Sequence, residues 1–130
     1  GVFLGVKHSI PAMRQTGIGG SFINISSVAG IKVFSPGGSV YSGTKFAVRA
    51  ISDGLRQEND RIRVTCVYPG VVESELADTI TDAATAEAIR GFRQVALKPE
   101  AIAHAIAHAV GQPADVDTTD IVVRPVAHPA

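Results

Sequence analysis

Apolar residues recur every three or four positions in three stretches of the chain, residues 1–13, 39–58 and 99–110. This spacing is typical of a helix that buries one face. The third stretch begins at Pro99, which suits the first turn of a helix, and the neighbouring Glu100 suits the positive end of the helix dipole. The pattern therefore predicts three helices.

Three other stretches are short, rich in strand-forming residues and bounded by turn-forming or polar residues, as strands are. They cover residues 21–26, 61–68 and 121–123. The first two are separated by a loop at 27–38 and by a predicted helix, with no hairpin turn between them. Such a connection is a right-handed crossover between parallel strands. Because no repeat or linker interrupts the chain, we expect a single α/β unit.

Residues 71–98 follow neither pattern. They are mixed in composition and rich in Ala, Thr and Asp, with helical patches at 75–80 and 85–95. We expect a helical excursion from the sheet and not a core strand. Because it lies between two elements that the sheet holds, we also expect it to move without unfolding the core.

Composition and charge exclude several classes of protein. The chain has 130 residues, with 12 Lys and Arg against 12 Asp and Glu, so no overall positive field favours nucleic acid. The longest nearly apolar stretch, residues 101–110, is too short to cross a bilayer, which disfavours a membrane protein. The mixed-charge run at 56–63 is expected to be solvated surface.

The chain contains one cysteine, Cys66, inside a predicted buried strand. A single cysteine cannot form an internal disulfide, which favours a reducing, cytoplasmic compartment. We expect Cys66 to be a core residue without chemistry. No secretion signal is visible.

Candidate chemistry gathers between the first two predicted strands. Tyr41 and Lys45 are four residues apart on a predicted helix, so they share one face. A phenol is a poor acid or base near neutral pH unless a cation favours the phenolate, and Lys45 is the available cation. Ser27 and the Pro69-Gly70 pair follow the two strands, at the edge where parallel sheets bind ligands.

Three segments together carry a resemblance to a known family. They are Asn-Ile-Ser-Ser-Val-Ala-Gly at 24–30, Tyr-Ser-Gly-Thr-Lys at 41–45 and Val-Tyr-Pro-Gly at 67–70. This set resembles the short-chain dehydrogenase/reductase family, single-domain oxidoreductases that use NAD or NADP, and the resemblance runs from residue 1 to about 126. It implies a Rossmann-like doubly wound parallel sheet and an enzyme that interconverts a secondary alcohol and a ketone or aldehyde by hydride transfer.

The resemblance also implies roles for individual residues. Ser27 matches the serine that orients the substrate, with Ser26 as the rival for that role. Tyr41 matches the catalytic acid/base, and Lys45 matches the lysine that favours its phenolate and hydrogen-bonds the nicotinamide ribose.

The cofactor contacts are implied in the same way. Pro69, Gly70 and Val72 are similar to the turn whose backbone meets the nicotinamide carboxamide. Ser74 stands where the family usually has a threonine near the carboxamide and phosphate. Residues 71–98 correspond to the mobile lid over the substrate, and nothing in the sequence chooses between NAD and NADP.

Two family features have no counterpart in the sequence. The relay asparagine would lie just upstream of Gly1, and the glycine-rich dinucleotide loop is absent. The glycines at 17–20 come after a predicted helix and before a predicted strand, which is the reverse of a phosphate-binding loop, so we expect a simple turn. The chain is therefore interpreted as the carboxy-terminal half of one Rossmann-fold domain, spanning 1–130.

Other interpretations stay open or are set aside. A dinucleotide-binding protein without turnover, and an isomerase or dehydratase with the same residues, are alternatives to the oxidoreductase. His104 and His108 are four residues apart but have no third ligand, so we expect no metal site. Apolar positions outside the sheet-facing stripe in 1–13 and 40–58 indicate a homo-oligomer, a dimer or a tetramer.

Overall fold

A parallel sheet forms the centre of the computed structural model, which describes residues 1–34 and 36–127. Position 35, inside the loop expected at 27–38, and positions 128–130 lie outside the described residues. The strands are β1 (Gly20–Ile25), β2 (Ile62–Pro69) and β3 (Asp120–Val123), and in the described residues they pair in the order β1-β2-β3. Both pairings are parallel, as the crossover argument predicted for the first two strands.

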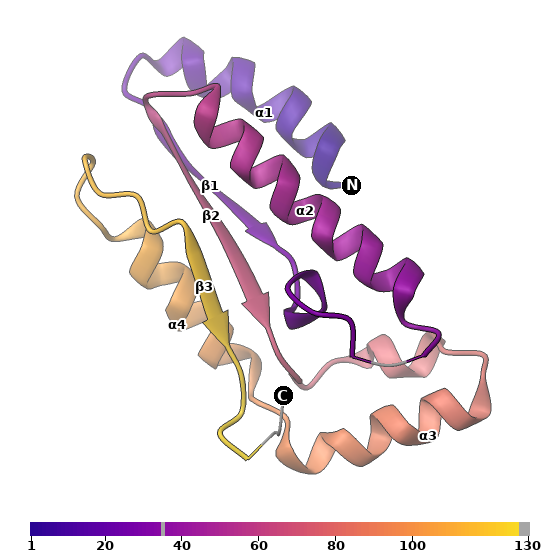
Figure 1. The fold of residues 1–130 in the computed structure, drawn as a ribbon. Coiled ribbons are helices and arrows are strands. Elements are labelled where there is room, and N and C mark those ends of the chain that lie inside the picture. The colour runs from indigo at the N-terminus through magenta and orange to yellow at the C-terminus, as the bar shows by residue number, and fades with distance from the viewer. Residues whose placement is uncertain (35, 128–130) are drawn as a thin grey trace.

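Helices cover the two faces of this sheet (Figure 1). The helices α1 (Val2–Thr16) and α2 (Ser39–Gln57) lie on one face, and α4 (Pro99–Val110) lies on the other. The three predicted helices are confirmed, and the bounds of α4 agree with the prediction. The chain is thus an α/β unit with the layer order of a Rossmann-like fold.

Side chains that alternate along β2 make the core beneath α1 and α2. Ile62 and Val64 pack with Ile10 of α1 and Leu55 of α2, and Cys66 and Tyr68 pack with Val48. Alternation places every second residue of a strand on one face, so the four β2 residues face the same pair of helices. Cys66 is fully buried there, as expected.

The glycines between α1 and β1 form a turn. Gly17 adopts φ 69° at the end of α1, a left-handed conformation in which glycine ends many helices. Gly19 also has a positive φ, 84°, and its position against the carbonyl of Arg61 leaves no space for a Cβ atom. The expected turn at 17–20 is confirmed.

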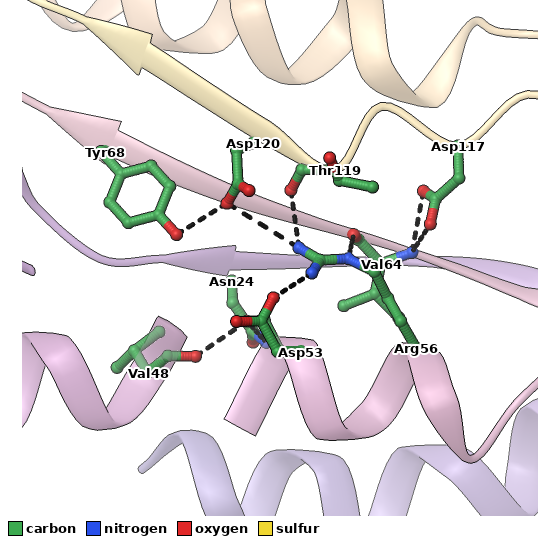
Figure 2. Close-up of polar contacts among 10 residues, drawn as sticks. Asn24, Val48, Asp53, Arg56, Val64, Tyr68, Asp117, Thr119 and Asp120 are labelled. Carbon is green, nitrogen blue, oxygen red and sulfur yellow. Dashed lines mark hydrogen bonds and ion pairs between the residues drawn. The ribbon is translucent and has the colours of Figure 1, made fainter. Parts of the chain in front are cut away.

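A polar cluster joins α2 to β2 and to the start of β3 (Figure 2). Arg56 donates hydrogen bonds of 2.8 Å to the carbonyls of Val64 and Thr119, and it pairs with Asp53. Asp117 accepts a hydrogen bond from the backbone N–H of Val64, at 3.1 Å for Oδ1. The expectation of solvated surface is wrong for Arg56, whose side chain is 17% exposed, because it donates to the carbonyl of Val64 in β2 and to that of Thr119 just before β3.

The excursion after β2 is helical, and its two ends contact each other. It contains the 3₁₀ turn η2 (Glu75–Thr79), the helix α3 (Ala83–Phe92) and the 3₁₀ turn η3 (Arg93–Val95). Val72 and Leu97 form an isolated parallel bridge, which the sequence pattern did not predict. The Nζ atom of Lys98 lies 2.7 Å from Oε1 of Glu73 beside that bridge. We call this bridge and ion pair the clasp.

No helix in the described ranges is both long and apolar enough to cross a membrane.

Candidate active site

The expected site residues come from three segments that meet at the carboxyl ends of β1 and β2. Ser27 follows β1 by two residues, and Pro69 is the last residue of β2. The parallel register that pairs Ile25 with Val67 brings these two strand ends to the same edge of the sheet. This edge is where open parallel sheets bind ligands.

Tyr41 and Lys45 lie one turn apart in the first half of α2. The Nζ atom of Lys45 is 5.8 Å from the centroid of the Tyr41 ring, within the range of a cation–π contact. The Tyr41 side chain is 47% exposed, so its ring faces open space at the edge of the sheet. The predicted pairing of a phenol with a cation on one helix face is present in the structure.

Ser27 begins the 3₁₀ turn η1 (Val28–Gly30), and its Oγ accepts a hydrogen bond of 3.1 Å from the backbone N–H of Ala29. A hydroxyl that accepts in this way keeps its own hydrogen to donate to another oxygen. Ser26 differs, because it is 3% exposed and its Oγ donates to the carbonyl of Lys45 at 2.8 Å. Of the two serines, Ser27 is the one able to donate to a substrate.

A pocket of about 650 Å³ opens at this edge. Six of the seven expected residues line it, and the seventh, Lys45, lies beside Tyr41. The six are Ser27, Tyr41, Pro69, Gly70, Val72 and Ser74.

The far wall of the pocket is apolar. It is made by Ile80 and Ile89 of the excursion and by Ile102 and Ile106 of α4, and none of the described residues that line the pocket is charged. Sequence reasoning did not assign α4 to the site. The helical spacing of Ile102 and Ile106 is the signal that could have done so.

The turn after β2 requires a glycine. The backbone N–H of Gly70 donates to the carbonyl of Val123 at 2.8 Å, which brings the end of β3 close. A Cβ atom at position 70 would lie 2.8 Å from the Cβ atom of Arg124, closer than such atoms approach one another. Gly70 therefore permits the strand ends to meet directly beside the pocket.

Tyr68 supports this turn from inside the core. Its hydroxyl donates a hydrogen bond of 2.7 Å to Oδ1 of Asp120, at the start of β3 (Figure 2). Burial raises the pKa of the Tyr68 phenol far above its ordinary value, and the hydrogen bonds with Cys66 and Asp120 raise it further. Tyr68 is therefore neutral and structural, unlike the exposed Tyr41.

The two histidines of α4 lie on the surface. His104 and His108 are exposed, and Gln112 donates to the carbonyl of His108 at 3.0 Å. Within 1–34 and 36–127 there is no group of three His, Cys, Asp or Glu residues placed to hold a metal ion.

Comparison with known proteins identifies the class to which this fold and site belong. The family model described as short chain dehydrogenase matches residues 1–85. The chain therefore belongs to the short-chain dehydrogenase family.

Individual relatives agree with this family. An uncharacterized oxidoreductase of Staphylococcus saprophyticus is 43% identical over 129 residues, covering 96% of this chain and 52% of the relative. The crystal structure of serine dehydrogenase from Escherichia coli superposes with a TM-score of 0.75 at 29% identity, covering 96% of this chain and 48% of that one. The closed form of serine dehydrogenase complexed with NADP+ superposes with a TM-score of 0.74 at 33% identity, covering 85% of this chain and 46% of that one. The chain thus spans about half the length of the relatives it matches.

Proposed function

We propose that this chain is the carboxy-terminal half of an NAD(P)-dependent oxidoreductase that interconverts a secondary alcohol and a ketone or aldehyde. The observation that carries the proposal is that Ser27 and Tyr41 line one pocket and that Lys45 lies beside Tyr41. Residues 1–130 then form the later part of one Rossmann-fold domain, with residues 71–98 as a lid over the substrate.

Tyr41 is the acid/base of the proposed reaction. In the direction of oxidation its phenolate oxygen accepts the hydroxyl proton of the alcohol, while the hydrogen on the carbinol carbon leaves as hydride and the C=O bond forms. In the direction of reduction its phenol returns that proton to the carbonyl oxygen. The open space beside Tyr41 leaves room for a substrate at hydrogen-bond distance.

Ser27 orients the substrate. Because its Oγ is held by the N–H of Ala29, its hydroxyl hydrogen is directed by the η1 turn and is donated to the oxygen that Tyr41 also contacts. A donor fixed in advance stabilises the charge that develops on this oxygen during reaction.

Lys45 holds its positive charge close to Tyr41, with Nζ 5.8 Å from the ring centroid. Its flexible ammonium group carries three donors, which suits a second contact with the hydroxyls of a ribose.

The described residues fit the nicotinamide end of the cofactor. The pocket lining is mainly apolar and carries a few hydroxyl groups, including those of Ser27 and Ser74. Such a lining suits a flat aromatic amide. Gly70 has no side chain, so the backbone of this turn lies directly against the residues that follow β3. When bound, the nicotinamide accepts or supplies the hydride. Pro69, Gly70, Val72 and Ser74 would hold it, and the solved serine dehydrogenase complex with NADP+ supports a nicotinamide dinucleotide here.

The pocket also supports a class of substrate. Since no charged residue lies among its described lining, a small or medium, mostly uncharged carbonyl compound fits it best.

The test uses the full-length protein and measures oxidation of NADH and NADPH against a panel of ketones and aldehydes, with products identified by mass spectrometry. Carbonyl-dependent oxidation that yields the alcohol supports the proposal. Cofactor binding without turnover would point to a regulatory dinucleotide-binding protein. Rearranged or dehydrated products without net oxidation of the cofactor would point to an isomerase or dehydratase.

A further inference from the structure

Ser26 joins the three segments that carry the candidate site. Its backbone N–H donates to the carbonyl of Val67 in β2 at 2.8 Å, and its Oγ donates to the carbonyl of Lys45 in α2 at 2.8 Å. Its own chain continues directly into Ser27. With 3% exposure, these bonds are shielded from competing water.

Gly30 closes the same junction from the other side. A Cβ atom at this position would overlap Oγ of Ser26 and would lie 2.8 Å from the carbonyl oxygen of Lys45. The N–H of Gly30 donates to the carbonyl of Ser27 at 2.8 Å, so the η1 turn folds back onto α2. Because an obstructing backbone atom cannot rotate away as a side chain can, only glycine permits this approach.

We propose that Ser26 is a positioning residue: by holding the Lys45 turn of α2 against β1, with Gly30 as the close contact, it sets the spacing between Ser27 and the Tyr41–Lys45 pair. This inference rests on the proposed function and deepens it. It also gives the two adjacent serines different roles: Ser27 donates to the reacting oxygen, and Ser26 holds α2 in place against the end of β1.

A directional contact fixes the spacing between α2 and the residues that follow β1. The carbonyl of Lys45 sits on the helix turn that follows Tyr41, so a bond to it restrains Tyr41 and Lys45 together. Apolar packing alone tolerates small shifts, whereas a buried hydrogen bond is directional. A shift of about 1 Å in a catalytic group is enough to slow a reaction by up to roughly 100-fold.

The first test compares two serines in the full-length protein. Ser26→Ala should lower kcat about tenfold and leave the dissociation constant of the cofactor within about twofold. Ser52→Ala is the matched control, because the Ser52 hydroxyl is equally buried and also joins α2 to β1, but about two helical turns beyond Lys45. It accepts a hydrogen bond from Asn24 at 2.9 Å and donates to the carbonyl of Val48 at 2.8 Å. Ser52→Ala should reduce the melting temperature without lowering kcat.

A second comparison uses two glycines. Gly30→Ala should lower kcat more than Ser26→Ala does, since its added methyl group pushes the Lys45 turn outward. Gly54→Ala is the control. Gly54 lies in α2, as Lys45 does, and nothing lies within 4 Å of its Cβ position, so kcat should be unchanged.

A double-variant cycle tests whether Ser26 acts through Tyr41. If it does, Ser26→Ala should cause little further loss in a Tyr41→Phe background, because the group it positions has gone. The inference would be overturned if the kcat loss of the double variant equalled the product of the two single losses. A Ser26→Ala variant with unchanged kcat would overturn it as well.

Hydrogen exchange gives a readout that needs no turnover. Without cofactor, Ser26→Ala should speed amide exchange in residues 28–45, and Ser52→Ala should not. Unchanged exchange there would contradict the junction itself. A wild-type protein without oxidoreductase activity would instead defeat the proposed function, so the two failures are distinguishable.

Discussion

The ammonium of Lys45 lies 5.8 Å from the centre of the Tyr41 ring, one helical turn along α2. Tyr41 is 47% exposed and lines the pocket, so its phenol is accessible there. The pair therefore combines an exposed phenol with a nearby cation.

Tyr41→Phe removes the hydroxyl, which is the proposed proton-transfer group, and keeps the ring. In the full-length protein we expect kcat to fall about 100-fold or more, by the usual magnitude of general acid/base catalysis, while the cofactor dissociation constant changes little. Steady-state kinetics and a fluorescence titration with the cofactor measure the two quantities. Full activity in this variant would end the proposed role of Tyr41.

Lys45 has two proposed tasks, and two variants examine them. Lys45→Ala should reduce both kcat and cofactor affinity, since it removes the charge and the donors. Lys45→Met keeps most of the chain's length and packing and should show the same double loss. A Met variant that loses only rate would show that the ribose contact is wrong.

We expect the clasp to divide the excursion into fixed ends and a moving middle. Leu97 donates to the carbonyl of Val71 at 2.9 Å, and Glu73 donates to the carbonyl of Leu97 at 2.9 Å. We therefore expect slow amide exchange at Glu73 and Leu97 and fast exchange in residues 75–95 when no cofactor is present. Cofactor should slow the middle more than it slows α4, as measured by hydrogen-exchange mass spectrometry.

One variant tests the ion pair of the clasp separately from the segment between its ends. Lys98→Met removes an exposed ion pair and should leave the melting temperature almost unchanged, but it should raise exchange at Glu73 and Leu97. Equal slowing of the middle and of α4 on cofactor binding would show instead that the excursion is a rigid packing element.

Tyr68→Phe tests the buried phenol. Loss of its hydrogen bond to Asp120 should cost about 1–2 kcal/mol of unfolding free energy near pH 7. The folded state raises the pKa of Tyr68, so the native phenol stays neutral where an unfolded tyrosine ionises, above about pH 10. The unfolded state then binds fewer protons, and stability falls as pH rises through that range.

The pH dependence is measurable by urea unfolding between pH 7 and 11. The wild-type protein should lose more stability over the alkaline part of this range than Tyr68→Phe does. Parallel curves would contradict the assignment of the shift to Tyr68.

The outer surfaces of α1 and α2 predict self-association. Phe3 and Leu4 of α1 and Val40 of α2 are more than half exposed, and Phe46 of α2 is also exposed. Burial of such side chains stabilises an interface, so we expect a dimer or tetramer by light scattering of the full-length protein. Phe46→Glu should lower the measured mass, and a wild-type monomer at micromolar concentration would refute this expectation.

Sequence patterns predicted the strands to within about one residue because hydrophobic periodicity reflects burial, which also defines the observed elements. The family resemblance singled out six of the residues that line the pocket, but no sequence pattern assigned the isoleucines of α4 to it. The patterns did not predict the Val72–Leu97 bridge, since a single paired residue on each side creates no period. Nor did they reveal that Arg56 satisfies the carbonyl of Val64, because charge alone does not show which backbone groups lack a strand partner.

The two serines show the same limit on a smaller scale. Ser26 and Ser27 are chemically identical, and residue type cannot separate their roles. Strand alternation could have done so, because Asn24 and Ser26 both face α2, where they bond to Ser52 and to Lys45.

The clasp has a consequence for how such a protein diversifies. Since the excursion leaves and rejoins the framework at neighbouring points, the segment between Glu73 and Leu97 can lengthen or shorten while its ends stay in place. Doubling the length of a flexible loop costs only about 0.6 kcal/mol of closure entropy. Insertions, deletions and grafts in this segment can therefore alter what is admitted to the pocket while Ser27, Tyr41 and Lys45 keep their geometry, so that selectivity and chemistry are able to evolve separately.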